Sequence, residues 1–143
     1  MEIELAAIAD YALTDTNGKM SVIGIWDSVN APRFPVLHPQ MYVCLRIAFQ
    51  TIEFGTKHKL RIALHDQDGA LVGPDIGADF DVPRPSQGTA RKSVAQLALG
   101  YQGVVFHKPG VYSFDISIDN NHVKSLPLQV VELGMSQVGD GLA

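Results

Sequence analysis

Apolar side chains alternate with polar ones in two consecutive runs near the end of the chain. The apolar positions are Tyr112, Phe114, Ile116 and Ile118 in the first run, and Leu126, Leu128 and Val130 in the second. Because successive side chains of a β-strand point to opposite faces, each run has one apolar and one polar face. Between the runs, residues 119–122 (Asp-Asn-Asn-His) favour a turn, since Asp and Asn tolerate positive φ. The segment 110–132 therefore predicts an antiparallel hairpin over a hydrophobic core.

Similar alternation recurs along the rest of the chain. It predicts strands over 3–11, 20–29, 41–50, 58–65, 78–82 and 95–101, with a short additional strand at 70–72. The Asn17-Gly18 pair is the strongest turn signal, because it suits two successive positive-φ positions. No stretch has a convincing helical period of 3.6 residues. Seven to nine short strands predict an all-β fold, a single-domain antiparallel β-sandwich of immunoglobulin or fibronectin-like type.

Two stretches depart from simple alternation. Residues 20–29 carry apolar groups on both faces, which predicts a strand covered by the core on one side and by a loop or a neighbouring subunit on the other. Gly24 within it indicates a bulge or a close approach of another backbone. Residues 30–40 contain three prolines and are predicted to form neither helix nor ladder, but an ordered crossover between the two sheets.

The length of 143 residues fits one domain, which we predict to span 1–133, followed by a flexible tail at 134–143 without periodicity. With 46% hydrophobic residues, the core needs no disulfide. Cys44 is the single cysteine and lies within an apolar run, so it is predicted to be a buried, inert thiol.

The first residues, Met-Glu-Ile-Glu-Leu, carry acidic groups where a secretory signal has basic ones. No apolar run approaches the roughly 18 residues of a membrane span. We therefore expect a cytoplasmic protein, or part of a cytoplasmically assembled particle, without membrane contact. The net charge of −4 argues weakly against a nucleic-acid partner.

Motifs for catalysis or for cofactor binding are not visible. The Asp66–Gly69 segment (Asp-Gln-Asp-Gly) resembles a fragment of a calcium loop but lacks its terminal glutamate, so a hairpin turn is the favoured interpretation. The five histidines have no zinc spacing, and no nucleophile elbow occurs. Asp79 and Asp81 share one face of a predicted edge strand, where charges commonly prevent edge pairing. We expect no cofactor and no metal.

Two groups of residues suit recognition of a partner. The first combines Trp and Phe with neighbouring basic and apolar groups, and such residue types are enriched at protein interfaces. It comprises Trp26, Arg33, Phe34, Leu37 and His38. The alternative is that these aromatics cap the open end of the sandwich. The second group is a basic strip of Arg46 and Arg61, with Lys59 nearby, on strands expected to be neighbours; the alternative is a solvated sheet face.

The segment Ala9–Asp27, followed by Ala-Pro-Arg-Phe-Pro at 31–35 and His-Pro-Gln at 38–40, resembles a family of bacterial all-β domains of unknown function. Together with the hairpin residues, the resemblance runs from about Ile8 to Val131. It implies the same β-sandwich fold and a bacterial or bacteriophage origin. Because the family carries no established activity or cofactor, the resemblance implies no site.

Three functions are open at this point. The leading hypothesis is a non-enzymatic interaction or structural module that self-associates or binds a protein partner. The alternative is a small-molecule or carbohydrate-binding module that uses loops around Trp26, Tyr101 or His107 at one end of the sandwich. The third is a hydrolase with a dispersed, histidine-based site.

Overall fold

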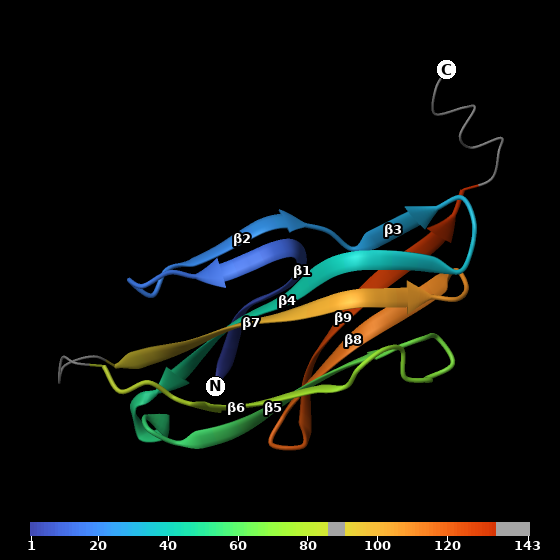
Figure 1. The fold of residues 1–143 in the computed structure, drawn as a ribbon. Helices are drawn as coiled ribbons and strands as arrows, with labels where there is room; N and C mark the ends of the chain where they lie inside the picture. Colours follow the sequence, from blue (N-terminus) through green and yellow to red (C-terminus); the bar gives the residue numbers. More distant parts are fainter. Residues whose placement is uncertain (86–90, 134–143) are drawn as a thin grey trace.

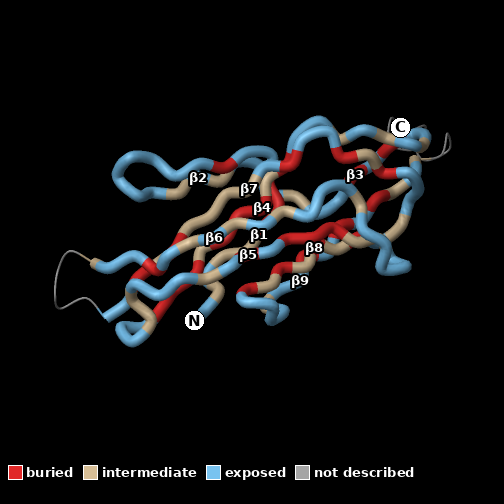
Figure 2. Tube along the Cα trace, turned by 60° about the horizontal axis from the view of Figure 1, so that its bottom comes forward, coloured by how far each residue is buried: buried red, intermediate tan, exposed pale blue. Residues whose placement is uncertain are grey.

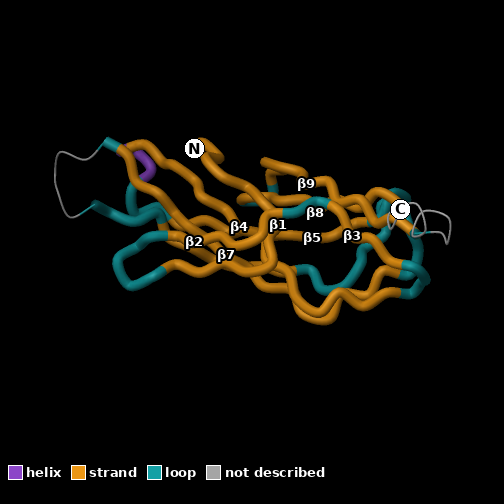
Figure 3. The backbone as a smooth tube through the Cα atoms, turned by 90° about the horizontal axis from the view of Figure 1, so that it is seen from above, coloured by secondary structure: helices purple, strands orange, loops and turns teal. Residues whose placement is uncertain are grey.

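The computed structural model describes residues 1–85 and 91–133, which form nine strands and one short 3-10 helix (Figure 1). The strands are β1 (Glu2–Thr14), β2 (Met20–Ile25), β3 (Ser28–Ala31), β4 (Val36–Gln50), β5 (Lys57–His65), β6 (Ile76–Asp81), β7 (Lys92–Phe106), β8 (Gly110–Ile118) and β9 (Asn121–Glu132). The helix, η1 (Thr51–Glu53), lies between β4 and β5. Strands dominate the whole length of the described chain (Figure 3).

The strands form two sheets that face each other. Sheet A has the order β2-β1-β4-β7, and sheet B has the order β3-β9-β8-β5-β6. All neighbours are antiparallel except β3 and β9, which run parallel. The predicted all-β, single-domain sandwich is confirmed. The predicted tail at 134–143 lies outside the described residues, as do residues 86–88 of the exposed loop that the prolines and glycine of 83–88 predict.

The core lies between the sheets, where the inward side chains of both meet. The buried residues are coloured red along the strands in Figure 2. Strand β4 alone contributes five side chains with no exposed surface, namely Met41, Val43, Leu45, Ile47 and Phe49. Strands β5 and β8 face them with Leu60, Ile62, Leu64, Phe114 and Ile116. Full burial of one such side chain contributes roughly 1.5–3 kcal/mol. The alternation of apolar residues in the sequence thus becomes the inner face of each sheet.

The topology is immunoglobulin-like. The neighbouring strands β1-β4-β7 and β9-β8-β5 repeat the A-B-E and G-F-C orders of immunoglobulin sheets. Near the start of β8, the hydroxyl of Tyr112 donates a hydrogen bond to the Lys108 carbonyl at 2.6 Å. A tyrosine that bonds back to the backbone at this corner is a hallmark of that fold.

Two predicted boundaries are wrong. Residues 20–29 are not one strand, because β2 ends at Ile25 in sheet A and β3 begins at Ser28 in sheet B. Residues 30–40 do cross between sheets, but Val36 onward already pairs with β7, from Val36 opposite Phe106. Residues on both sides of Pro39 pair with β7, whereas Pro39 itself has no partner in the ladder. The proline therefore interrupts the pairing at one position and does not prevent it.

Cys44 is buried as predicted, with no exposed surface, on the outer side of β4. Burial raises the pKa of its thiol to about 11. Because only the thiolate attacks disulfide reagents, we expect no labelling of the folded protein at about pH 8, and rapid labelling once urea unfolds it. Labelling in native buffer at the rate of a free thiol would contradict this burial.

Within residues 1–85 and 91–133, no helix combines the length and apolar character that crossing a membrane requires.

Candidate functional site

The hairpin of β1 and β2 lies on the outer face of sheet A and adds a partial third layer to the sandwich (Figure 1). Residues up to Ala9 of β1 pair with β4, and residues from Ala9 to Thr14 pair with β2. The inner side of the hairpin packs on sheet A through a small second core of Ala9, Ala12, Met20, Val22, Tyr42, Cys44 and Ala98. At its turn, the Gln96 side chain of β7 donates to the Gly18 carbonyl at 2.8 Å. The hairpin is therefore held in one orientation.

The hairpin also carries four large apolar side chains that are partly exposed to solvent; one of them, Tyr11, also meets the ring of Tyr42 edge to face with centroids 5.2 Å apart. Tyr11, Leu13, Ile23 and Ile25 are 41%, 38%, 58% and 64% exposed. Tyr11 lies opposite Ile23 in the β1–β2 ladder, so the four residues are neighbours on one ribbon. Scattered exposed apolar residues are ordinary, but a contiguous group is typical of a binding surface. We name Tyr11, Leu13, Ile23 and Ile25 the hairpin surface; the exposed hairpin projects from the body in Figure 2.

The hairpin surface adjoins a sheet edge that pairs with no other strand of the described residues. Strand β2 is the last strand of sheet A, and its sequence Met-Ser-Val-Ile-Gly-Ile has no charge and no proline. The edge strand β6 differs, because Asp79 and Asp81 lie opposite Lys59 and Lys57 of β5. Charges of this kind discourage pairing with another chain. Strand β2 has no such protection.

Gly24 holds the shape of the β2 strand. Its φ of +68° is a conformation that other residues rarely adopt, and a Cβ here would lie 2.6 Å from Asp10 Oδ2. Gly24→Ala is therefore expected to lower the free energy of unfolding by about 1–3 kcal/mol, measured by urea denaturation. Gly18→Ala is the matched control, because its φ is +80° but nothing lies within 4 Å of its added Cβ. Equal losses in the two variants would show that the contact with Asp10 is unimportant.

The predicted aromatic group splits into buried and exposed members. Trp26 and Phe34 are half-buried and pack against the main core, and their part in an interface stays a prediction. Trp26 and His38 lie with their ring centroids 4.9 Å apart. Arg33 is exposed, and Leu37 is 59% exposed. That Arg33 and Leu37 take part in an interface stays a prediction.

The predicted basic strip does not exist. Arg46 lies on β4 in sheet A and Arg61 lies on β5 in sheet B, so the two face outward on opposite sides of the sandwich. Consecutive alternating strands can form a hairpin or can cross between sheets, and the connection through η1 crosses. Arg46 Nε also donates to Glu4 Oε1 at 2.9 Å. Arg46 is thus beside a carboxylate.

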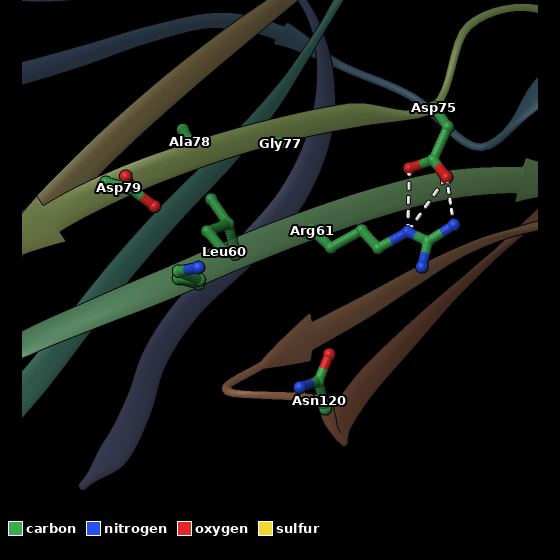
Figure 4. A pocket seen from close by; sticks show the side chains of 8 residues that line it. Leu60, Arg61, Asp75, Gly77, Ala78, Asp79 and Asn120 are labelled. Carbon is green, nitrogen blue, oxygen red and sulfur yellow. Dashed lines mark hydrogen bonds and ion pairs between the residues drawn. The ribbon is translucent and has the colours of Figure 1, made fainter.

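The outer face of sheet B contains shallow polar depressions. One, of about 420 Å³, is lined by Lys59, Leu60, Arg61, Asp75, Gly77, Ala78, Asp79 and Asn120 (Figure 4). Arg61 Nε donates to both carboxylate oxygens of Asp75, at 2.9 and 2.8 Å. This bond raises the pKa of the Arg61 guanidinium and is the main cause that lowers the pKa of Asp75. The charged groups of Arg61 and Asp75 in this depression therefore pair with each other.

A hydrogen-bond network centred on Asp115 lies on the same face. Asp115 Oδ2 contacts His65 Nδ1 at 2.7 Å, and Oδ1 accepts from the hydroxyls of Ser113 and Ser125 at 3.0 and 2.7 Å. Burial raises the pKa of Asp115, but the bonds from Ser125, His65 and Ser113 together outweigh it and leave the pKa lowered. The carboxylate is therefore ionised and accepts all three bonds.

The network has one feature of a nucleophilic site, the 2.7 Å contact between Ser125 Oγ and His122 Nε2. However, Ser125 donates its proton to Asp115, and no described side chain orients His122 through Nδ1. A serine nucleophile needs its proton directed to an oriented base. Nor do the described residues contain a group of three His, Cys, Asp or Glu side chains suited to a metal. The arrangement is that of a polar network on a sheet face.

Two of the residues predicted to surround a small-molecule site, Tyr101 and His107, lie in different environments. Tyr101 is 1% exposed, and its hydroxyl donates to the Ile62 carbonyl at 3.2 Å inside the core. It cannot line a ligand site at the surface, so that part of the prediction is wrong. His107 is exposed and borders a depression of about 340 Å³ near Gly73 and Val104.

Comparison with known protein families assigns the chain to a family. The model of DUF6941, described as a family of unknown function, matches residues 4–131. The chain belongs to the DUF6941 family. The predicted membership of an uncharacterised all-β family is thereby confirmed.

No curated protein matches this DUF6941 chain. Among solved structures, it is similar to the CARDB domain of the PF1109 protein from Pyrococcus furiosus, which was determined in complex with di-metal ions. The two chains are 12% identical, and the match covers 93% of this chain and 98% of that one with a TM-score of 0.44.

In this DUF6941 protein, the sequence predicted the two strands and the turn of the β1–β2 hairpin but did not predict the hairpin surface. The apolar residues on both faces of β2 were the signal, and they predicted a cover on each side. Sheet A covers Val22, while Ile23 and Ile25 face solvent. Leu13 was missed and Tyr11 was a candidate by its polarity alone, because the sequence does not show that β1 leaves β4 beyond Ala9 to pair with β2.

Proposed function

We propose that this DUF6941 protein is a non-catalytic β-sandwich module that binds protein, a second copy of itself or another chain, through the hairpin surface. The observation that carries the proposal is the exposure of Ile23 and Ile25, at 58% and 64%, beside Tyr11 and Leu13. Removing apolar surface from water contributes roughly 25 cal/mol per Å². A partner that covers this ribbon gains that energy.

The hairpin is also ordered before a partner binds. Its inner side is fixed on sheet A by Ala12, Val22 and Cys44, and its turn is held by Gln96. A surface that is already ordered loses little conformational entropy when a partner binds. The free edge of β2 offers backbone N–H and C=O groups beside the apolar ribbon. Both features support recognition of a protein over recognition of a small molecule.

Sedimentation of the purified chain over a wide concentration range tests this proposal. We expect a mass that rises above that of the monomer with concentration, or a stoichiometric complex with a partner that co-purifies from the native host. Either species is expected to lose mass when the hairpin surface is substituted. A monomer at every concentration, with no co-purifying chain, would contradict the proposal.

A further inference from the structure

The segment that contains β2 is complementary to a second copy of itself running in the opposite direction. From Lys19 to Asp27 it reads Lys-Met-Ser-Val-Ile-Gly-Ile-Trp-Asp, with one basic and one acidic end. Both end residues are exposed, and neither side chain forms an ion pair within residues 1–85 and 91–133. Antiparallel pairing of two copies about Ile23 brings each Lys19 opposite the Asp27 of the other copy. A two-fold axis at Ile23 makes this pair twice.

The charges select one register of this pairing. A shift of one residue sets Lys19 opposite Trp26 or Ser28 of the second copy, according to its direction. Asp27 then has no cation opposite it. Complementary charges at the rim of an interface fix its register and disfavour the alternatives. The pairing centred on Ile23 is therefore the favoured one.

The large side chains also match across the axis. Tyr11 lies opposite Ile23 in the β1–β2 ladder, so the axis extends this row to the same two residues of the second copy. Leu13 lies opposite Ser21, and the same register sets Ser21 opposite Ile25 of the second copy. Each small serine thus lies between two larger apolar side chains. Directly opposed side chains on antiparallel strands are in contact range, so the two hairpin surfaces join into one apolar face.

The backbone of the segment forms a continuous edge. At one end, the Asp15 N–H donates to the Lys19 carbonyl at 2.9 Å, and at the other the Trp26 N–H donates to the Ile8 carbonyl at 3.0 Å. The segment therefore stays beside β1 from Lys19 to Trp26. On its other side, β2 pairs with no strand of the described residues.

We propose that the partner of the hairpin surface is a second copy of this chain, paired antiparallel along β2 about a two-fold axis at Ile23. The inference rests on the proposed function, because it names the occupant of the same surface. Edge strands without charge or proline are those that pair with other chains. The other edge of sheet A is less suited, since antiparallel copies of β7 would bring Lys92 close to Lys108 of the second copy.

A disulfide at position 23 tests this pairing. Directly opposed residues of antiparallel strands have Cα atoms about 4.5–5.5 Å apart, within the roughly 4.4–6.8 Å that a disulfide spans. Ile23 is 58% exposed, so its substitution leaves the fold intact. We expect Ile23→Cys to form a covalent dimer under mild oxidation, seen on a non-reducing gel. Cys44 does not compete, because burial raises the pKa of its thiol to about 11.

Tyr11→Cys and Ile52→Cys are the matched controls. Tyr11 belongs to the same surface, but in the proposed dimer three strand spacings of about 4.8 Å separate its two copies, which no disulfide spans. Ile52 is 90% exposed on η1 and reports random collision. Both should stay uncross-linked. Cross-linking of either control as fast as that of Ile23→Cys would contradict the pairing.

Reversal of the end charges tests the register. Lys19→Asp and Asp27→Lys each replace the two ion pairs of the dimer by two like-charge pairs, so we expect the dimer Kd to rise about tenfold. The double variant K19D/D27K restores both pairs and should dimerise like the wild type in sedimentation. Single variants that dimerise normally, or a double variant weaker than both, would rule out this register.

The fate of the proposed function is read separately from Ile23→Asp. Association that is lost in Ile23→Asp, without a covalent dimer of Ile23→Cys, would mean that the hairpin surface binds another chain, and the self-pairing alone would fail. Association unchanged in Ile23→Asp would refute both.

Discussion

Ile23→Asp is expected to abolish association of this chain with its protein partner while the fold remains intact. Ile23 is 58% exposed, so aspartate is well solvated in the free protein and costs it little. In a complex, the carboxylate would be buried without a partner, which costs several kcal/mol. A loss of about 3 kcal/mol lowers the affinity more than 100-fold. Sedimentation should therefore find the variant as a monomer at concentrations where the wild type is assembled.

Ile52→Asp is the matched control for this experiment. Ile52 is 90% exposed on η1, outside the hairpin surface, and receives the same change of residue. It should assemble like the wild type. Loss of assembly in Ile52→Asp but not in Ile23→Asp would place the interface around η1 and would contradict the role of the hairpin.

Phe114→Ala is expected to lower the free energy of unfolding by about 3–5 kcal/mol. Phe114 has no exposed surface, and its ring meets that of Tyr101 edge to face with centroids 5.2 Å apart. It lies two residues after Tyr112, at the inward position where antibody domains place a disulfide cysteine. In this chain an aromatic ring therefore fills the centre between the sheets, and truncation would leave a cavity there.

Urea denaturation followed by tryptophan fluorescence measures this effect. Val111→Ala provides the control, since Val111 lies on the same strand but is 48% exposed, and the change should stay within about 0.5 kcal/mol. A Phe114→Ala variant as stable as Val111→Ala would show that β8 does not supply the centre of the core.

The local parts of the fold were predictable from the sequence. The hairpin predicted over 110–132 is β8 and β9, and its turn residues Asp119 and Asn120 do have positive φ, at 53° and 67°. Alternation depends on neighbouring residues alone, so it survives folding wherever one face of a sheet meets the core. The edge strand predicted at 78–82 is also found, as β6.

The arrangement of strands was not predictable in the same way. Alternation does not tell whether two strands share a sheet, and this is why Arg46 and Arg61 were placed together although β4 and β5 lie in different sheets. The crossing after Ile25 and the parallel pairing of β3 with β9 depend on residues about 100 positions away. The contact of His58 with Asp119 was not predictable for the same reason, since 61 positions separate the two residues.

The candidate site was predictable only in part. Apolar residues on both faces of β2 indicated an extra contact, and the structure shows which residues remain uncovered. Trp26 and Phe34 are aromatic residue types enriched at interfaces, and both are half-buried against the core. Residue type alone cannot separate an interface from the capped end of a sandwich.

Hydrogen exchange of the backbone amides, compared between the associated and the dissociated protein, tests the hairpin surface most directly. We predict that association slows exchange in residues 9–25, above all around Tyr11 and Ile23, and leaves the outer face of sheet B unchanged. Protection confined to β5, β6 and β8, with the hairpin exchanging as before, would contradict the hairpin surface and would move the interface to the polar face around Arg61.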